Sequence, residues 1–445
     1  MSGAVDIRQS HIVRLFLLGV LTLVLQVPIV MIALLAGERA DRRSAAAADI
    51  ASTWGGPQSI TGPALVVPYE HRSTEVLKEG GRPIDRVETR RLILLPDRLT
   101  IGGPLNVESR QRGIFTVPVY TMRLQVEGTF SRSGLATLGI DPSMVAWDRA
   151  ELALGVSDAR AIQDQVTVTW NDRPIAFVPG VTGLDPIHTG IHAPIALVPN
   201  GVDRFTFPLV VNGSTGAYFA PFAEETVVQL TSNSPNPNFQ GHWLPANREV
   251  TSAGFNARWT VPYLGRDFPQ AWTSASAPSD AITRARFGVE LTDPVDPYRM
   301  ADRSVKYAAL FIILTFASVW LVEVMADVRV HPIQYLFIGA ALCLFYLLEL
   351  SLSEHMRFGL AYGLSTIAIV AMVTAYCRVA LGKLGRMLVV GAGTSALYGY
   401  LYVVLTDEDT ALLVGALGLF VALGLVMIIT RRIDWYRLGR RDPAV

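Results

Sequence analysis

Three residues with the chemistry of metal ligands, Asp185, His188 and His192, lie close together in the sequence. Two histidines four residues apart share one face of a helix, but Pro186 and Pro194 disfavour a helix over this segment. On a strand, which rises about 3.3 Å per residue, the histidines would lie about 13 Å apart and could not share one zinc ion. We therefore predict no metal site here and no cofactor elsewhere in the chain.

A second polar group consists of Arg110, Arg112 and Tyr120, which bracket a turn at Gly113. The planar guanidinium groups could read a ligand through paired hydrogen bonds. Equally, the two arginines could brace a β-turn against buried carbonyl groups. The sequence supports both hypotheses, and we take these residues as the candidate surface outside the apolar segments.

Glu354 and His355 follow the end of a long apolar run, beside Ser351 and Ser353. Since histidine titrates near physiological pH, the pair could sense protons or touch a neighbouring domain. The interpretation that we favour is a polar turn at a membrane interface that caps two helix ends.

Two further carboxylates, Glu323 and Glu349, lie within apolar runs, where a charge is costly and usually has a partner. A transport or proton-relay role is one hypothesis for them. Because each lies near the end of its run, we expect both side chains to reach water instead.

Catalytic motifs are not found in the sequence, which has no P-loop, Gly-x-Ser-x-Gly, His-Glu-x-x-His or paired-cysteine metal motif. The two cysteines, Cys343 and Cys377, lie in apolar runs and are expected to pack there rather than form a redox pair. We predict no catalytic residues and interpret the protein as a non-enzymatic one.

Six apolar runs are long enough to cross a hydrocarbon core of about 30 Å at about 1.5 Å per residue. The first is about 25 residues long, too long for the apolar core of about 7 to 15 residues in a cleaved signal peptide. The sequence therefore predicts a membrane-embedded α-helical bundle with one N-terminal and five C-terminal spans, at residues 12–36, 305–325, 333–352, 358–376, 387–405 and 411–430.

Residues 38–304 have a different composition and are expected to form a large β-rich, sandwich-like domain outside the membrane. A charged, alanine-rich helical stalk extends to about residue 53, and short alternating runs separated by Gly, Pro, Asn and Asp follow. Residues 232–245, rich in Pro and Asn, are predicted to be a surface loop, with the lip of a cleft as the alternative. The domain has no cysteine and hence no disulfide.

Charge in the short connections predicts orientation, because cytoplasmic loops are rich in Lys and Arg. Arg378, Lys383 and Arg386 mark one side, with the basic tail at 431–445, and the acidic residues 407–409 mark the other. We predict that both termini, including residues 1–11, are cytoplasmic and that the large domain is outside. The basic residues at 39, 42 and 43 contradict this pattern, but long domains cross largely regardless of charge.

The junction from the large domain to the second span holds Pro294 and Pro297, which fix φ and stiffen the chain. Arg303 and Lys306 follow at the expected level of the lipid headgroups. The junction contains no Gly/Ser-rich linker, so we predict that it transmits a signal or holds the domain at a set height. His331 and Gln334, at the start of the third span, complete the candidate functional surface together with Glu354, His355 and the Arg110 group.

The chain resembles the CreD family of bacterial inner-membrane proteins, a family linked to cell envelope integrity. The resemblance covers nearly the whole chain and rests on the order and spacing of segments such as 110–115 (RQRGIF), 294–298 (PVDPY), 303–307 (RSVKY), 331–335 (HPIQY), 351–355 (SLSEH), 398–402 (YGYLY) and 430–436 (TRRIDWY). Glu349 departs from the family pattern, which is apolar there. The resemblance implies an inner-membrane protein connected with envelope stress, without an established catalytic mechanism.

These observations predict a non-enzymatic protein that supports or monitors envelope integrity through a periplasmic domain. A transporter or permease component is the alternative, and a membrane enzyme is a third hypothesis. The expected partners are the lipid bilayer and envelope proteins or components. The net charge of +0, from 38 basic and 38 acidic residues, argues against nucleic acid.

Overall fold

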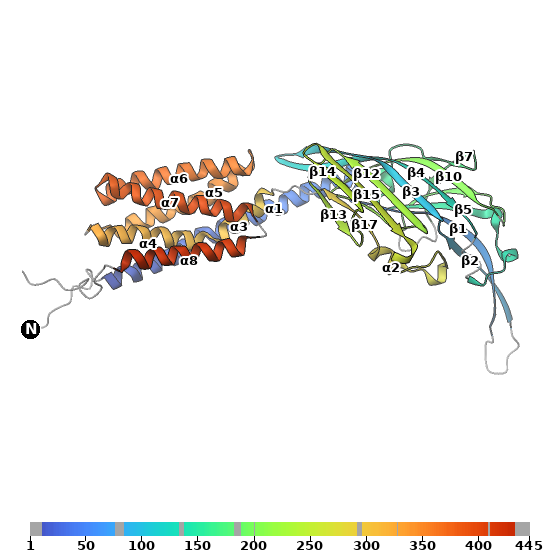
Figure 1. The fold of residues 1–445 in the computed structure, drawn as a ribbon, viewed down its shortest axis with the longest axis horizontal. Coiled ribbons are helices and arrows are strands. Elements are labelled where there is room, and N and C mark those ends of the chain that lie inside the picture. Colours follow the sequence, from blue (N-terminus) through green and yellow to red (C-terminus); the bar gives the residue numbers. More distant parts are fainter. Residues whose placement is uncertain are drawn as a thin grey trace, which may run out of the picture. The chain divides into compact units, whose positions relative to one another are not determined.

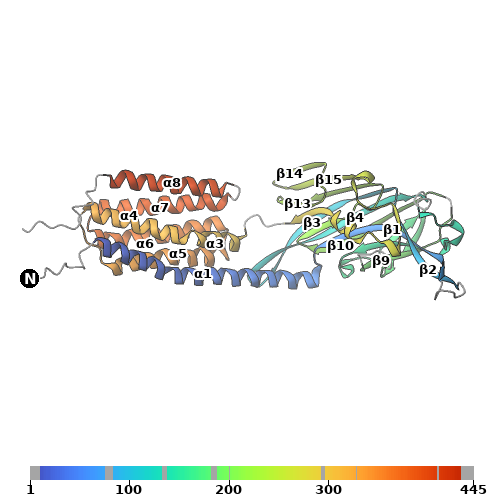
Figure 2. The same cartoon turned by 90° about the horizontal axis from the view of Figure 1, so that it is seen from below.

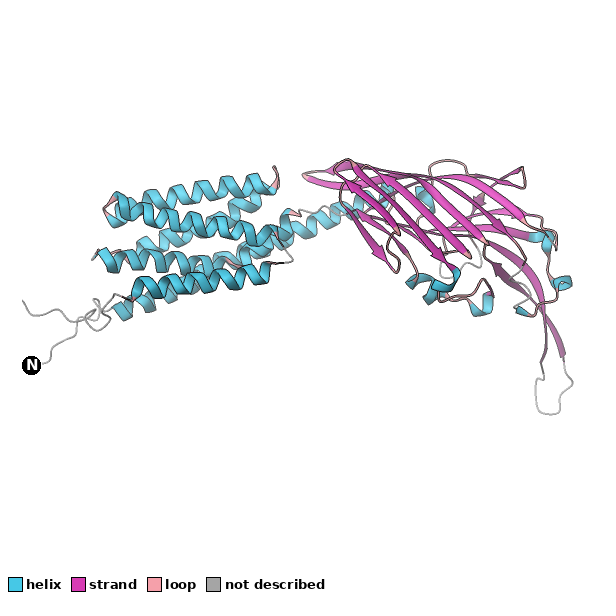
Figure 3. Ribbon diagram, in the orientation of Figure 1, coloured by secondary structure: helices cyan, strands magenta, loops and turns pink. Residues whose placement is uncertain are grey.

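A computed structural model describes residues 11–75, 84–132, 138–181, 188–199, 201–291, 296–326, 328–407 and 410–431. The chain divides into two compact units, one formed by residues 1–43 and 295–445 and the other by residues 44–294. Helices build the first unit, and strands dominate the second (Figure 3).

Within the described residues, six helices are long and apolar enough to cross a membrane, one near the N-terminus and five near the C-terminus. This confirms the predicted number and arrangement of apolar helices, and Figure 1 shows the C-terminal ones running side by side. The helices of this unit are α1 His11–Trp54, α3 Pro297–Lys306, α4 Ala308–Ala326, α5 Pro332–Ser353, α6 Phe358–Leu381, α7 Leu384–Thr406 and α8 Ala411–Thr430.

Helix α1 combines two predicted elements in one unbroken helix of 44 residues (Figure 2). It begins in the apolar run and continues through the charged, alanine-rich stretch predicted as a stalk. It ends at Trp54, immediately before Gly55, which adopts a positive φ of 126° that favours glycine. Its first part belongs to the helical unit and its last turns, from Ser44, belong to the other unit.

The core of the helical unit is rich in aromatic side chains from α5, α6 and α7. The ring of Phe345 lies 5.1 Å from that of Tyr346, 5.3 Å from that of Tyr362 and 4.3 Å from that of Tyr398, between centroids. Such offset and edge-on ring pairs stabilise a core beyond the area that they bury. Helix α8, in contrast, buries none of its residues, and an apolar groove of about 790 Å³ runs between it, α4 and α7.

The second unit contains two β-sheets, of nine and eight strands among the described residues. The first runs β13-β17-β11-β1-β5-β9-β8, with β2 on β1 and β16 on β2; its strands are β1 Gln58–Glu75, β2 Ile84–Leu94, β5 Ala150–Val156, β8 Val178–Pro179, β9 Gly190–Ile195, β11 Gly216–Phe219, β13 Pro237–Gly241, β16 Ala271–Thr273 and β17 Phe287–Leu291. The second runs β14-β15-β12-β3-β4-β10-β6-β7; its strands are β3 Arg98–Arg112, β4 Phe115–Phe130, β6 Thr167–Trp170, β7 Arg173–Ala176, β10 Asp203–Ser214, β12 Glu225–Ser232, β14 Asn247–Thr251 and β15 Gly254–Pro262.

Both sheets contribute to one hydrophobic core, which confirms the predicted β-rich architecture. Trp259 on β15 joins them, because its ring centroid lies 5.8 Å from that of Phe287 on β17 and 5.6 Å from that of Phe239 on β13. Strand β6 is an example of the predicted alternating runs, with Val168 and Trp170 buried. The segment 232–245 was predicted as a loop, but part of it forms strand β13. The strand was not predicted because it pairs with β17, a long-range contact that local composition does not reveal.

Candidate functional site

Five charged or hydroxyl-bearing residues of the helical unit form a cluster that we call the polar clamp: Arg39 and Arg43 of α1, Asp296 and Tyr298 at the start of α3, and Glu354 at the end of α5. Arg43 Nη1 lies 2.8 Å from Asp296 Oδ2, and Arg39 Nε lies 3.7 Å from Glu354 Oε1. The Tyr298 hydroxyl donates a hydrogen bond to Glu354 Oε1 at 3.1 Å. The clamp therefore ties three helices together at one end of the bundle.

Local sequence explains how these side chains are presented. Arg39 and Arg43 are four residues apart and so lie on one face of α1. Asp296 is the N-cap of α3, accepting a hydrogen bond from the Tyr298 backbone N–H at 3.0 Å, and Pro297 occupies the first helical turn, where it needs no hydrogen bond. The Asp-Pro-Tyr sequence thus starts the helix and places two clamp residues at its first turn.

The clamp is partly shielded from water, which strengthens its interactions. The Glu354 side chain is 10% exposed, and Tyr298 is 5% exposed. Burial, followed by the neighbouring Glu354 carboxylate, raises the pKa of Tyr298 to about 12. The tyrosine therefore stays protonated at physiological pH and remains a hydrogen-bond donor to the carboxylate.

Helix α3 makes further contacts with the bundle below the clamp. Arg303 Nη2 donates to the backbone oxygen of Val404, 3.1 Å away in the last turn of α7, where a positive charge is favourable. The Ser304 hydroxyl donates to Glu349 Oε2 at 2.7 Å. Lys306 forms a surface ion pair of 2.6 Å with a residue of its own helix, Asp302, so of the two predicted basic residues only Arg303 joins α3 to another helix.

The expectation that Glu323 and Glu349 reach water is wrong, because both residues are buried, at 3% and 0% exposure. Each carboxylate contacts a polar group from another part of the sequence. The position of the carboxylate within its own span does not reveal such a partner. Glu349 bonds Ser304, whereas Glu323 forms an ion pair with Arg14 and accepts a hydrogen bond from the Tyr335 hydroxyl at 2.8 Å.

His331 and Gln334 act together at the start of α5. The His331 backbone N–H donates to Gln334 Oε1 at 2.9 Å, and the Ile333 N–H donates to His331 Nδ1 at 3.3 Å. These bonds satisfy backbone donors that the first helical turn leaves without partners. The structure thus gives both residues a capping role.

The side chains of Glu354 and His355 have different surroundings in the structure. Glu354 terminates α5 and joins the polar clamp, while the His355 side chain is exposed to solvent. Glu354 combines the predicted capping position with contacts to two other helices.

The Arg110 group lies in the β unit, where its members contact different neighbours. The Arg110 guanidinium lies 4.4 Å from the centroid of the Trp54 ring, and Arg112 forms an ion pair with Asp49. Trp54 and Asp49 belong to the last turns of α1. Tyr120 is fully buried and donates to a backbone oxygen of β11 at 2.7 Å. The arginines thus hold the end of a helix, and Tyr120 belongs to the core.

The predicted absence of a metal site concerns residues that the structure covers in part. His192 Nδ1 lies 2.7 Å from the backbone oxygen of Gly180, and Asp185 lies outside the described residues. No group of three potential His, Cys, Asp or Glu ligands occurs among the residues with described positions.

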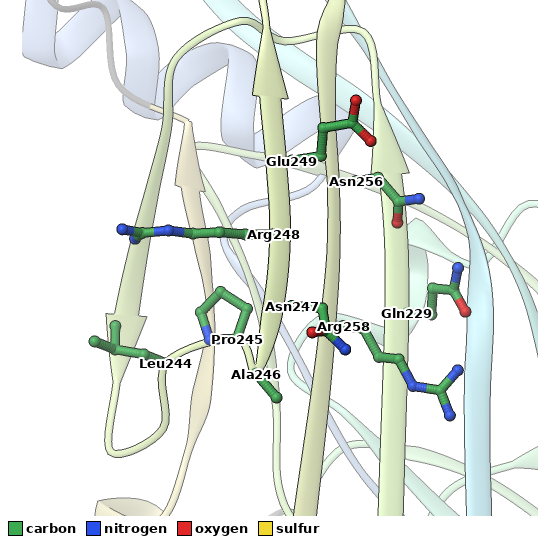
Figure 4. Close-up of a pocket in the computed structure, with 9 residues that line it drawn as sticks. All are labelled: Gln229, Leu244, Pro245, Ala246, Asn247, Arg248, Glu249, Asn256 and Arg258. Atoms are coloured by element: carbon green, nitrogen blue, oxygen red, sulfur yellow. The ribbon is translucent and has the colours of Figure 1, made fainter.

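A shallow surface groove of about 700 Å³ lies on the β unit (Figure 4). Gln229, Asn256 and Arg258 project from one face of neighbouring strands, and Leu244 and Pro245 belong to the segment considered as the lip of a cleft. Amide and guanidinium groups suit a polar ligand, but no charged side chain there is buried, so the groove is less organised than the polar clamp. Its lining residues are Gln229, Leu244, Pro245, Ala246, Asn247, Arg248, Glu249, Asn256 and Arg258.

Four clamp residues, Arg39, Arg43, Asp296 and Tyr298, were not among the predicted site residues. One sequence feature could have identified them: Arg39 and Arg43 lie on the side of the membrane where the charge pattern of the loops predicts few basic residues. Basic residues on an unexpected side call for acidic partners, and Asp296 and Glu354 are the partners that the structure shows.

Comparison with known proteins agrees with this architecture. The family described as "Inner membrane protein CreD" matches residues 10–436. A curated relative, Inner membrane protein CreD of Escherichia coli (strain K12), is 32% identical over 419 residues, which cover 93% of this chain and 91% of the relative.

Proposed function

This chain belongs to the CreD family of inner membrane proteins, and from that premise we propose that it is a non-enzymatic protein that supports or monitors the integrity of the cell envelope. The observation that carries this proposal is the pairing of Arg43 with Asp296. Arg43 is the last residue of the helical unit before the β unit, and Asp296 follows the β unit almost immediately. Both covalent connections of the β unit are therefore anchored at one point of the bundle.

We further propose that the β unit is periplasmic and that both termini are cytoplasmic. The basic connection around Arg378, Lys383 and Arg386 supports this orientation, as does the acidic residue Asp407 in the following connection. Arg39 and Arg43, which depart from the charge pattern, gain acidic partners in the polar clamp and so have a structural reason to stay on the periplasmic side.

In this proposal the β unit senses or bears a load in the envelope and the polar clamp passes it to the bundle. Helix α1 is continuous across the boundary between the units, and α3 is attached to the bundle through Tyr298, Arg303 and Ser304. A pull on either connection would act on Glu354, which contacts both helices. Because the Glu354 side chain is nearly buried, losing one contact leaves a poorly solvated charge and favours rearrangement.

The experiment that tests this role is a charge exchange at Arg43 and Asp296. In a strain lacking the native protein, Arg43→Asp and Asp296→Arg should each fail to restore growth under envelope stress, since each places two like charges together. The double exchange restores opposite charges and should recover part of the function, because an arginine at position 296 cannot replace the aspartate as the N-cap of α3. Lys306→Gln, which removes an exposed ion pair on the same helix, is the matched control and should complement fully.

All variants would be checked for amount and membrane insertion, so that loss of function is separated from loss of protein. Full complementation by both single variants, at native abundance, would show that anchoring by the clamp is not needed for envelope function.

A further inference from the structure

Glu349 is a carboxylic acid inside the helical bundle that has no positively charged partner among the residues with described positions. Its side chain is fully buried on α5, and Oε2 accepts the hydrogen bond from Ser304. The second oxygen, Oε1, is also buried and makes no hydrogen bond to any described residue. In the described part of the chain, no ion pair reaches this carboxyl group. Its two oxygens therefore have unequal surroundings.

Three buried tyrosines lie in the aromatic core formed by the same helices. Tyr346 lies three residues before Glu349, on the same face of α5, and its ring contacts Phe345, as do those of Tyr362 of α6 and Tyr398 of α7. The Tyr362 hydroxyl donates to the Tyr398 backbone oxygen at 2.6 Å, whereas the hydroxyls of Tyr346 and Tyr398 are buried without a hydrogen-bond partner among the described residues. The site thus offers oxygen atoms that can exchange hydrogen bonds, but no cation.

The charged groups on the packed helices are directed elsewhere. On α3, Arg303 donates to the Val404 backbone and Lys306 pairs with Asp302. On α4, the only charged residue is Glu323, which lies at the other end of the bundle. On α1, Arg39 belongs to the polar clamp, where it faces Glu354.

An unpaired ionised carboxylate in an apolar interior is far more costly than a neutral carboxylic acid. Glu323 avoids that cost through its ion pair with Arg14, and no described residue forms such a pair with Glu349. We propose that Glu349 is a proton-binding site, at which an O–H bond forms at Oε1 with a proton taken from water. The neutral acid keeps the hydrogen bond from Ser304 at Oε2. This proposal is separate from the envelope function and does not depend on it.

Infrared spectroscopy of the full-length protein tests the proposal directly, in a detergent without ester groups. At neutral pH the native protein should show the C=O band of a protonated carboxyl group, and the band should shift in deuterium oxide. Glu349→Gln should remove this band. Glu323→Gln, which changes a buried carboxylate paired with arginine, should leave it unchanged. A native spectrum without the band, or a band that persists in Glu349→Gln, would overturn the proposal.

Thermal unfolding provides a second measurement with the same full-length proteins. Raising the pH from neutral to moderately alkaline should remove the proton and lower the Tm of the native protein more than that of Glu349→Gln, whose amide cannot ionise. Stabilisation of the native protein by sodium ions that disappears in Glu349→Gln would identify a bound cation as the neutralising species and reject the proton. Glu349→Leu serves as a third variant, should the amide disturb folding, and it should also lose the pH-dependent part of the Tm change.

Discussion

At the scale of single residues, Glu354 is the position where interactions from different helices meet. It terminates α5, faces Arg39 of α1 and accepts a hydrogen bond from Tyr298 of α3. The two buried carboxylates of the bundle also differ in their partners, since Glu323 pairs with Arg14 and Glu349 accepts a hydrogen bond from Ser304. Glu323, Glu349 and Glu354 therefore differ in the partner that each contacts rather than in their depth in the bundle.

Removing the Tyr298 hydroxyl tests the clamp with a minimal change. Tyr298→Phe keeps the ring and deletes the donor to Glu354, so it should lower the free energy of unfolding by about 1.5 kcal/mol, as expected for a hydrogen bond to a charged group. Tyr307→Phe is the matched control, since the Tyr307 side chain lines the apolar groove and should change stability by less than about 0.5 kcal/mol. Equal Tm values for Tyr298→Phe and the native protein would show that this bond adds nothing to stability.

At the scale of elements, α1 and α3 determine how the site is assembled. The periodicity and composition of the sequence were sufficient to predict the apolar helices and the β-rich domain, because burial of each element leaves a local pattern. The same information could not show that the span and the stalk form one helix, or that α3 is a separate helix ending before Tyr307. Nor could it pair Arg43 with Asp296, because more than 250 intervening residues fold into another unit before the two meet.

The last turns of α1 are predicted to be part of the folded β unit. A fragment of residues 44–294 should fold alone with a β-rich circular dichroism spectrum. A fragment beginning at Pro57 lacks Asp49 and Trp54, the partners of Arg112 and Arg110, and should be less stable by about 1–3 kcal/mol in urea unfolding. Two fragments of equal stability would show that the helix end is only a connection, and a mainly helical spectrum would contradict an autonomous β unit.

At the scale of the whole molecule, orientation connects the fold with the proposed function. Single cysteines at Ser232 and Asp407 should react with an impermeant thiol reagent in intact spheroplasts, and one at Lys383 should not. The native Cys343 and Cys377 are buried and would first be replaced by serine or alanine. Labelling at Lys383→Cys without labelling at the other two positions would reverse the proposed orientation and place the β unit in the cytoplasm.

The proposed function depends on coupling between the two units. A flexible insertion in the connection between them tests this coupling. An insertion after Tyr298 would lie inside α3 and break the helix. The better site is between residues 292 and 295, before the N-cap Asp296. A flexible Gly-Ser segment of about ten residues there would span about 18 Å on average and would leave every clamp residue in the chain.

If the junction transmits force or position, this insertion should impair growth under envelope stress, although the protein is made, inserted and folded to the native level. An insertion of the same segment between Asp407 and Thr410, in the connection from α7 to α8, is the matched control and should complement. The expected defect is partial, because α1 still connects the two units without an insertion and the pair of Arg43 with Asp296 still holds α3 on the bundle. Combining the insertion with Asp296→Ala should therefore give a stronger defect than the insertion alone, and full complementation by the combined variant would reduce the junction to a passive tether.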